Sequence, residues 1–331
     1  MNCGRYLVGA LVGAVVVGLV SEAAAQQAVP NEVFSVEDLI SGTSSTKERC
    51  ASTESALWIE VEARGDCIRY YAAGLKDRNN TAIIYFHGAR LFGSADPYRA
   101  GADQAAQKKL VEIVRAGYPD NTAAAQTEQV RWIQSGLDVP FIKIARPGVY
   151  GSSGDHKVRI HTREELLMAT AVEALAKRYA IENMAVIGNS EGGNIAAFAL
   201  SRLPNLKCVV LTSSALSLET ILKVDSTSGY NSSPGVYDPI KNVSMIPRSE
   251  HRRIFVVGDP ADQISPISNQ REYFDALIAA GHAAWYATTP TAAGGPHHTL
   301  DRTGMHIAKW CLEDVTSEEI LKRIAAGALR G

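Results

Sequence analysis

The chain has 331 residues, of which 46% are hydrophobic and 21% charged, as in a globular protein with a sizeable core. Its formal net charge is −2 and it contains no basic tract, so there is no electrostatic case for nucleic-acid binding. No charged or Pro/Ser-rich linker divides it, which favours one large domain.

The first 25 residues have the pattern of a secretory signal peptide. Arg5 precedes an apolar run from Tyr6 to Val20, and the segment ends in an A-x-A cleavage site at Ala23–Ala25. The apolar run is short for a transmembrane span. We therefore expect a mature domain of residues 26–331 that is secreted or periplasmic and not held at a membrane.

Residues 57–71 alternate apolar and polar side chains on either side of a turn at 63–66, which is the pattern of a β-hairpin. Cys50 lies a few residues before the first strand, and Cys67 opens the second. The hairpin brings the two close together, so we expect a disulfide between them. It would stabilise the fold by about 3 kcal/mol in the chain-entropy model.

Two cysteines of the mature chain remain after this pairing. Cys208 lies in an apolar run and Cys311 in a C-terminal helical pattern. An oxidising compartment permits a second bridge between them, but two free core thiols fit the pattern equally well.

Beyond the hairpin, apolar runs alternate with helical segments. Residues 81–86 are continuously apolar, which is typical of a strand covered on both faces. The alternation predicts an α/β fold, with a mostly parallel sheet between helices. Further strands are expected at residues 139–145, 184–187, 206–211, 253–257 and 283–287.

Two helix starts carry a recognisable signature. Thr162–Glu165 predicts a capping box that opens a helix ending near Tyr179, and Thr316–Glu319 predicts another that opens a final short helix. Residues 268–280 and 301–310 have apolar side chains at helical spacing.

Residues 90–138 and 213–250 do not fit the alternation of strands and helices. Long inserts at the ends of sheet strands are usually caps that face the substrate. Four aromatic side chains in these inserts are candidates either for lining an apolar pocket or for ordinary packing: Tyr98, Trp132, Tyr230 and Tyr237.

The stretch Ala185–Leu200 joins an apolar run, a Gly-x-Ser-x-Gly motif at Gly188–Gly192 and an amphipathic helical pattern. A strand that turns this sharply into a helix strains its central residue, Ser190, so small residues are needed two positions before and after it. The following helix directs N–H groups at the place where a tetrahedral intermediate carries negative charge. The pattern therefore indicates that Ser190 is a nucleophile.

A serine hydroxyl needs a base, and a histidine base needs a carboxylate that fixes its tautomer. Two acids, Asp259 and Asp262, follow one predicted strand, and two adjacent histidines, His297 and His298, follow the last one. The order Ser, Asp, His is that of α/β-hydrolases. Since residues on either side of a turn point in opposite directions, only one imidazole is expected to face Ser190.

From about residue 55 to the C-terminus, the chain resembles the α/β-hydrolase fold, including the secreted esterases and the prolyl-oligopeptidase-type hydrolase domains. Four motifs carry the resemblance: the oxyanion loop His87–Ala89, the glycine-rich loop Arg146–Gly154, the elbow Gly188–Gly192 and the acid loop Asp262–Pro266. The resemblance implies a mostly parallel central sheet with helices on both faces and cap-like inserts.

The resemblance also implies roles for the acids and the histidines. It favours Asp262 as the acid, because an apolar residue and a proline follow it as in the family; Asp259 is the alternative, and otherwise an exposed turn residue. It favours His298 as the base, because a small residue and Leu lead from it into a helix, and His297 remains the alternative.

By the same resemblance, the backbone N–H groups of Ala89 and Glu191 would form the oxyanion hole. His87 is expected to brace this loop rather than to act as a base, and Asp155 to cap or turn the loop after Gly154. The other histidines are expected at the surface or in the cap: His156, His161, His251, His282 and His306.

No cofactor or metal is expected. The sequence lacks H-x-x-x-H, C-x-x-C and EF-hand spacings, and its glycines do not match a dinucleotide fingerprint. The expected function is a secreted serine hydrolase that cleaves a small-molecule ester. A serine peptidase of prolyl-oligopeptidase type and a non-catalytic binding protein on the same scaffold are the alternatives. Neither the substrate's identity nor an oligomeric state is indicated.

Overall fold

The computed structural model describes Met1, Glu112, Tyr118 and residues 32–90, 121–224, 235–289 and 297–327. Residues 2–25 of the expected signal peptide, Tyr98 and Tyr230 lie outside the described residues. Within the described ranges, no helix is both long enough and apolar enough to cross a membrane.

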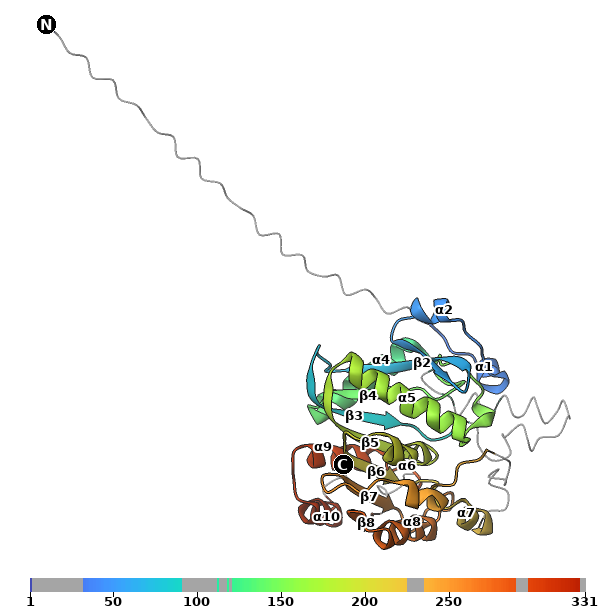
Figure 1. Ribbon diagram of the computed structural model, residues 1–331, viewed down its shortest axis with the longest axis vertical. Helices are drawn as coiled ribbons and strands as arrows, with labels where there is room; N and C mark the ends of the chain where they lie inside the picture. Colours follow the sequence, from blue (N-terminus) through green and yellow to red (C-terminus); the bar gives the residue numbers. More distant parts are fainter. Residues whose placement is uncertain are drawn as a thin grey trace.

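A sheet of eight strands forms the centre of the molecule, in the order β1-β2-β4-β3-β5-β6-β7-β8. β1 and β2 form the predicted antiparallel hairpin, β2 pairs antiparallel with β4, and all other pairs are parallel. Figure 1 shows the strands stacked from β2 down to β8. The strands are β1 (Ala56–Val61), β2 (Arg64–Ala73), β3 (Asn79–Phe86), β4 (Phe141–Ile144), β5 (Ile181–Asn189), β6 (Leu206–Thr212), β7 (Arg253–Gly258) and β8 (Ala284–Thr288).

Helices cover both faces of this sheet. In the described part of the chain they are α1 (Val36–Ser41), α2 (Lys47–Ala51), α4 (Ala123–Leu137), α5 (Thr162–Arg178), α6 (Gly192–Arg202), α7 (Leu218–Val224), α8 (Ile267–Ala279), α9 (Asp301–Leu312) and α10 (Ser317–Ala325), with 3₁₀ turns η2 (His156–Val158) and η3 (Pro239–Met245). α5, α6 and α8 pack on one face, and α4, α9 and α10 on the other. In β3, Ile84 is buried against the first group and Ile83 against the second, which explains its continuous apolar run.

The capping box predicted at Thr162 is wrong, although the helix itself is present. His161 is the N-cap of α5, and the Thr162 hydroxyl donates instead to the carbonyl of Gly235, 3.1 Å away. His161 is drawn into an antiparallel bridge with Val236, so the chain enters the helix one residue earlier than the local pattern suggests. The second predicted cap is confirmed, since Thr316 accepts a hydrogen bond from the N–H of Glu319 at 3.2 Å.

Both cysteine pairs lie at disulfide distance. Cys50 is bonded to Cys67, with Cα atoms 5.5 Å apart, as the hairpin argument predicts. Cys208 in β6 is bonded to Cys311 in α9, with Cα atoms 6.4 Å apart, so the second bridge and not the pair of free thiols is what the structure contains.

The two predicted inserts contain regular elements. α4 lies within residues 90–138 but connects β3 to β4 and packs against β2, so this part covers the sheet. Tyr237, in the second insert, is buried edge-on against Phe198 with ring centroids 5.1 Å apart, and it therefore packs in the core. Trp132, on α4, is 72% exposed.

Candidate active site

Ser190 lies at the tip of the turn between β5 and α6, with φ at 55° in the left-handed region. The glycines around it are required by close packing. A Cβ on Gly188 would lie 2.2 Å from the carbonyl oxygen of Gly192, and one on Gly192 would lie 2.2 Å from that of Phe86. The strained turn and its need for small residues are therefore as the sequence predicts.

Loops from neighbouring strands meet at this turn, because parallel strands end at the same edge of the sheet. The loop after β3 approaches closely: a Cβ on Gly88 would lie 2.9 Å from the Cβ of Ser190. The loop after β6 is tied to the turn by a hydrogen bond of 3.1 Å from the N–H of Ala215 to the carbonyl of Ser190. The acid loop joins them, since the Ser265 hydroxyl donates to the carbonyl of Ser214.

The two candidate acids and the two candidate histidines form two separate pairs. Nδ1 of His298 lies 2.9 Å from Oδ2 of Asp262, and Nδ1 of His297 lies 2.9 Å from Oδ2 of Asp259. When Nδ1–H donates to a carboxylate, a neutral imidazole presents Nε2 as its basic nitrogen. Each of the two histidines is therefore a candidate base.

The pairs differ in burial. The His298 side chain is 14% exposed and that of His297 is 55% exposed. Nε2 of His298 is buried and has no hydrogen-bond partner among the described residues. The loop that carries His298 is also anchored beside Ser190, because the N–H of Leu300 donates to the side chain of the preceding residue, Asn189, at 3.4 Å.

The carboxylate of Asp262 is held in place by the N–H groups of Ile264 and Ser265, at 2.8 and 2.9 Å. Asp259 was expected to be an exposed turn residue if not catalytic, and this is wrong: it is buried, although it does accept a turn hydrogen bond from the N–H of Ala261.

Two buried histidines hold the loop that contains Ala89. Nδ1 of His87 lies 2.7 Å from the carbonyl of Gly88, and Nε2 of His156 accepts from the N–H of Arg90 at 3.0 Å. Burial, with nearby guanidinium groups, lowers the pKa of each ring well below the usual value, so both are neutral. His87 braces the loop as predicted, whereas His156 is not at the surface.

A buried charged cluster next to Ser190 was not predicted from the sequence. The fully buried Arg146 donates to both oxygens of Glu164, at 2.8 and 3.0 Å, and to Glu191 at 3.2 Å. Arg159 donates to the other oxygen of Glu191 at 2.9 Å. Burial alone would raise the pKa of Glu191, but the two guanidinium groups outweigh it and hold that pKa below its usual range. The residue that follows Ser190 is thereby fixed as a carboxylate.

Glu165 lies next to this cluster but does not join it. It is fully buried, and neither carboxylate oxygen has a hydrogen-bond partner in the described residues. Burial and the neighbouring Glu164 raise its pKa well above the usual value. The folded protein therefore holds a proton on Glu165 that the unfolded chain releases, and this side chain lowers stability as the pH rises above about 4.5.

We expect Glu165→Gln to remove this pH dependence. Near pH 4.5 the variant and the wild type should be similarly stable, and the variant should gain by about 1.4 kcal/mol per pH unit until the pH reaches the raised pKa of the folded state. Urea unfolding between pH 4.5 and 8 measures the difference. A constant difference in unfolding free energy across this range would show that Glu165 does not titrate as its burial indicates.

Asp155 caps the turn after Gly154 as expected, accepting from the N–H of Lys157 at 2.9 Å. Within the ranges described, no group of three or more His, Cys, Asp or Glu side chains is arranged to hold a metal ion.

No protein-family model and no curated protein sequence matches the chain. Among solved structures, an acylaminoacyl peptidase of Pyrococcus horikoshii aligns at 13% identity and a TM-score of 0.50, over 80% of this chain and 43% of the peptidase. An esterase of Pyrococcus furiosus aligns at 14% identity and a TM-score of 0.48, over 86% and 98%, and a lipase/esterase of Lactobacillus plantarum at 11% and 0.44, over 70% and 89%. With the sheet order and the elbow, the first alignment shows the α/β-hydrolase fold.

Proposed function

We propose that this α/β-hydrolase-fold chain is a serine hydrolase that cleaves an ester, with Ser190, His298 and Asp262 as its catalytic triad. One observation carries the proposal: a buried, unpartnered Nε2 on a histidine that bonds a buried carboxylate, in a loop anchored beside a serine in the strained elbow conformation. This is the arrangement that activates a serine hydroxyl.

In the proposed mechanism, Nε2 of His298 accepts the proton of Ser190 as the serine oxygen attacks the ester carbonyl. The N–H groups of Ala89 and Glu191 stabilise the resulting oxyanion. His298 then gives its proton to the departing alcohol, which leaves an acyl group on Ser190. Water, activated by the same histidine, releases the acid and regenerates the enzyme.

A groove of about 580 Å³ supports an ester with an apolar group as the substrate. It lies between α4 and α9, and its lining includes Arg90 and Thr299, the residues directly after Ala89 and His298, together with the charged side chains of Lys143, Asp301 and Arg302. Its apolar lining comes from Trp132, Ile133, Leu137 and Met305.

The test is labelling of the purified protein by a fluorophosphonate probe, followed by assays on p-nitrophenyl esters of graded chain length and on aminoacyl and prolyl anilides. We expect Ser190 to be labelled and esters to be hydrolysed in preference to anilides. Preference for the anilides would make the protein a peptidase. Folded protein that neither labels nor hydrolyses any member of the panel would instead be a binding protein on this scaffold.

We also propose that residues 1–25 are a cleaved signal peptide and that residues 26–331 work in the periplasm or outside the cell. The two disulfides support this, because such bonds persist in oxidising compartments. Mass spectrometry of the exported protein would locate its first residue, expected at Gln26.

A further inference from the structure

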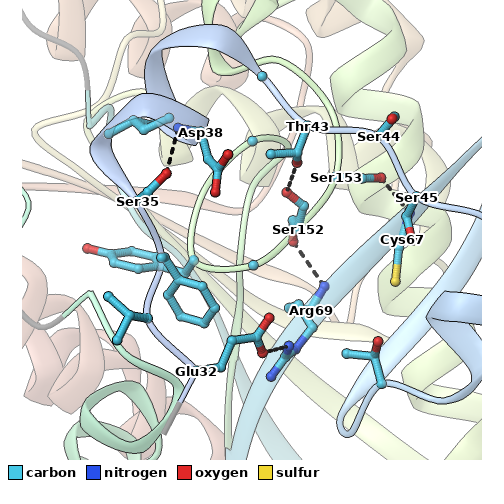
Figure 2. A pocket seen from close by; sticks show the side chains of 18 of the residues that line it. Glu32, Ser35, Asp38, Thr43, Ser44, Ser45, Cys67, Arg69, Ser152 and Ser153 are labelled. Carbon is cyan, nitrogen blue, oxygen red and sulfur yellow. Dashed lines mark hydrogen bonds and ion pairs between the residues drawn. The ribbon is translucent and has the colours of Figure 1, made fainter.

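A second pocket, of about 450 Å³, lies between the N-terminal segment at residues 32–53 and the loop at residues 148–153 (Figure 2). None of the residues proposed for catalysis lines it. Its walls are polar, with the hydroxyl groups of Ser35, Thr43, Ser44 and Ser45, which we call the rim hydroxyl groups, and with the charged side chains of Asp38 and Arg49. This pocket has the size of a small-molecule site.

At the edge of the pocket lies a buried cation, Arg69. Its side chain is 5% exposed, and its guanidinium carbon lies 6.0 and 5.8 Å from the ring centres of Phe34 and Tyr71. Nη1 donates to Oε2 of Glu32 at 2.6 Å (Figure 2). Nε is buried and has no hydrogen-bond partner among the residues described.

The buried Arg146 shows which hydrogen-bond partners another buried guanidinium group of this structure has. Arg146 donates from three nitrogens to two carboxylates, Glu164 and Glu191. Arg69, nearly as buried, has a single carboxylate partner in the described chain. A buried guanidinium N–H without an acceptor costs free energy, so an anionic oxygen that accepted from Arg69 would stabilise this side chain. The two oxygens of a carboxylate match the planar, paired donors of a guanidinium best.

The present partner of Arg69 is easily displaced. The Glu32 side chain is 46% exposed, so on leaving Arg69 it would be solvated at little cost. A ligand carboxylate that took its place would leave the rest of the ligand among the rim hydroxyl groups. Ser35 already accepts from the N–H of Asp38, and Thr43 and Ser45 donate to the carbonyls of Ser152 and Thr46, so Ser35 would donate to hydroxyl groups of the ligand while Thr43 and Ser45 would accept from them.

We propose that this pocket binds a small hydroxylated carboxylate, whose carboxylate group replaces that of Glu32 on Arg69. While no ligand is bound, the Glu32 carboxylate occupies the ligand's position on Arg69, so Glu32 acts as an internal competitor of the ligand. The proposal does not depend on the hydrolase activity, because the pocket and the catalytic residues are separate.

Calorimetric titration of the full chain with three probes tests the chemistry. D-gluconate carries both a carboxylate and hydroxyl groups, D-glucitol has the same chain without the carboxylate, and propionate has a carboxylate without hydroxyl groups. We expect gluconate to bind at least about tenfold more tightly than either of the others. Equal binding of gluconate and glucitol, or no binding of gluconate, would overturn the proposal.

Two variants should move the affinity in opposite directions. Glu32→Gln removes the competitor and should tighten gluconate binding severalfold, and Arg69→Met should weaken it by about tenfold or more. Arg49→Met, which removes an exposed cation from the same pocket, is the matched control and should change it by less than about threefold. If Arg69→Met does not fold, the Glu32→Gln result decides: unchanged or weaker binding would refute the competitor role.

Ser190→Ala should bind gluconate as the wild type does, and loss of binding in that variant would place the ligand at the catalytic residues instead.

Discussion

Ser190→Ala is expected to lower kcat on a working ester by about 10⁴-fold to 10⁶-fold, with little change in KM. The substitution removes only the hydroxyl oxygen, so the turn, its glycines and the oxyanion donors stay in place. What remains is the acceleration that comes from binding and from the oxyanion hole alone. Steady-state kinetics and loss of fluorophosphonate labelling measure the effect.

Ser213 provides a matched control for this substitution. It is also a buried serine in the left-handed region, with φ at 43°, and it lies at the end of the neighbouring strand β6. Ser213→Ala should keep activity within a few-fold of the wild type, because its hydroxyl has no hydrogen-bond partner in the described structure. Loss of activity in Ser213→Ala together with retention in Ser190→Ala would contradict the assignment of the nucleophile.

The second large effect is expected at the adjacent histidines. His298→Ala should lower kcat by about 10³-fold or more, because its buried Nε2, which has no hydrogen-bond partner among the described residues, is the proposed acceptor of the Ser190 proton. His297→Ala should cost less than about tenfold, since that side chain is more than half exposed. The two variants, assayed on the same ester, form a matched pair.

Substitution of each acid should lower kcat to an extent similar to substitution of the histidine that it bonds. Asp262→Asn should lower kcat by about 10³-fold to 10⁴-fold, because the amide no longer fixes the His298 tautomer, while Asp259→Asn should act as mildly as His297→Ala. If the large losses occur at His297 and Asp259 instead, the second pair is the catalytic one. Losses of equal size at all four positions would show that the two pairs act as one unit.

The elbow could be predicted from the sequence because every feature that defines it is local. An apolar run, closely spaced glycines and a helical pattern occur within Ala185–Leu200, and the structure has β5, the strained Ser190 and α6 there. The hairpin and the pairing of Cys50 with Cys67 were predictable for the same reason, since the two cysteines are only 17 positions apart in the sequence.

The buried charges around the elbow were not predictable. Arg146 bonds Glu164 and Glu191, which lie 18 and 45 residues away, and no local pattern marks either partner. The capping box at Thr162 was wrongly predicted for a related reason. The local sequence pattern is present, but the Thr162 hydroxyl donates instead to the carbonyl of Gly235, 73 residues away. The contact of Asp259 with His297 likewise joins residues that are 38 positions apart in the sequence. In each case the deciding contact forms only when the sheet assembles.

The bond between Cys208 and Cys311 closes a covalent ring of the chain in which both Asp262 and His298 lie. Proteases cut exposed backbone, and after a single cut in an open chain only non-covalent contacts hold the two pieces together. A single cut within this ring leaves both pieces attached through the disulfide, with α9 still joined to β6. The proposed acid and base would therefore stay covalently joined to Ser190 after such a cut, until the disulfide itself was reduced.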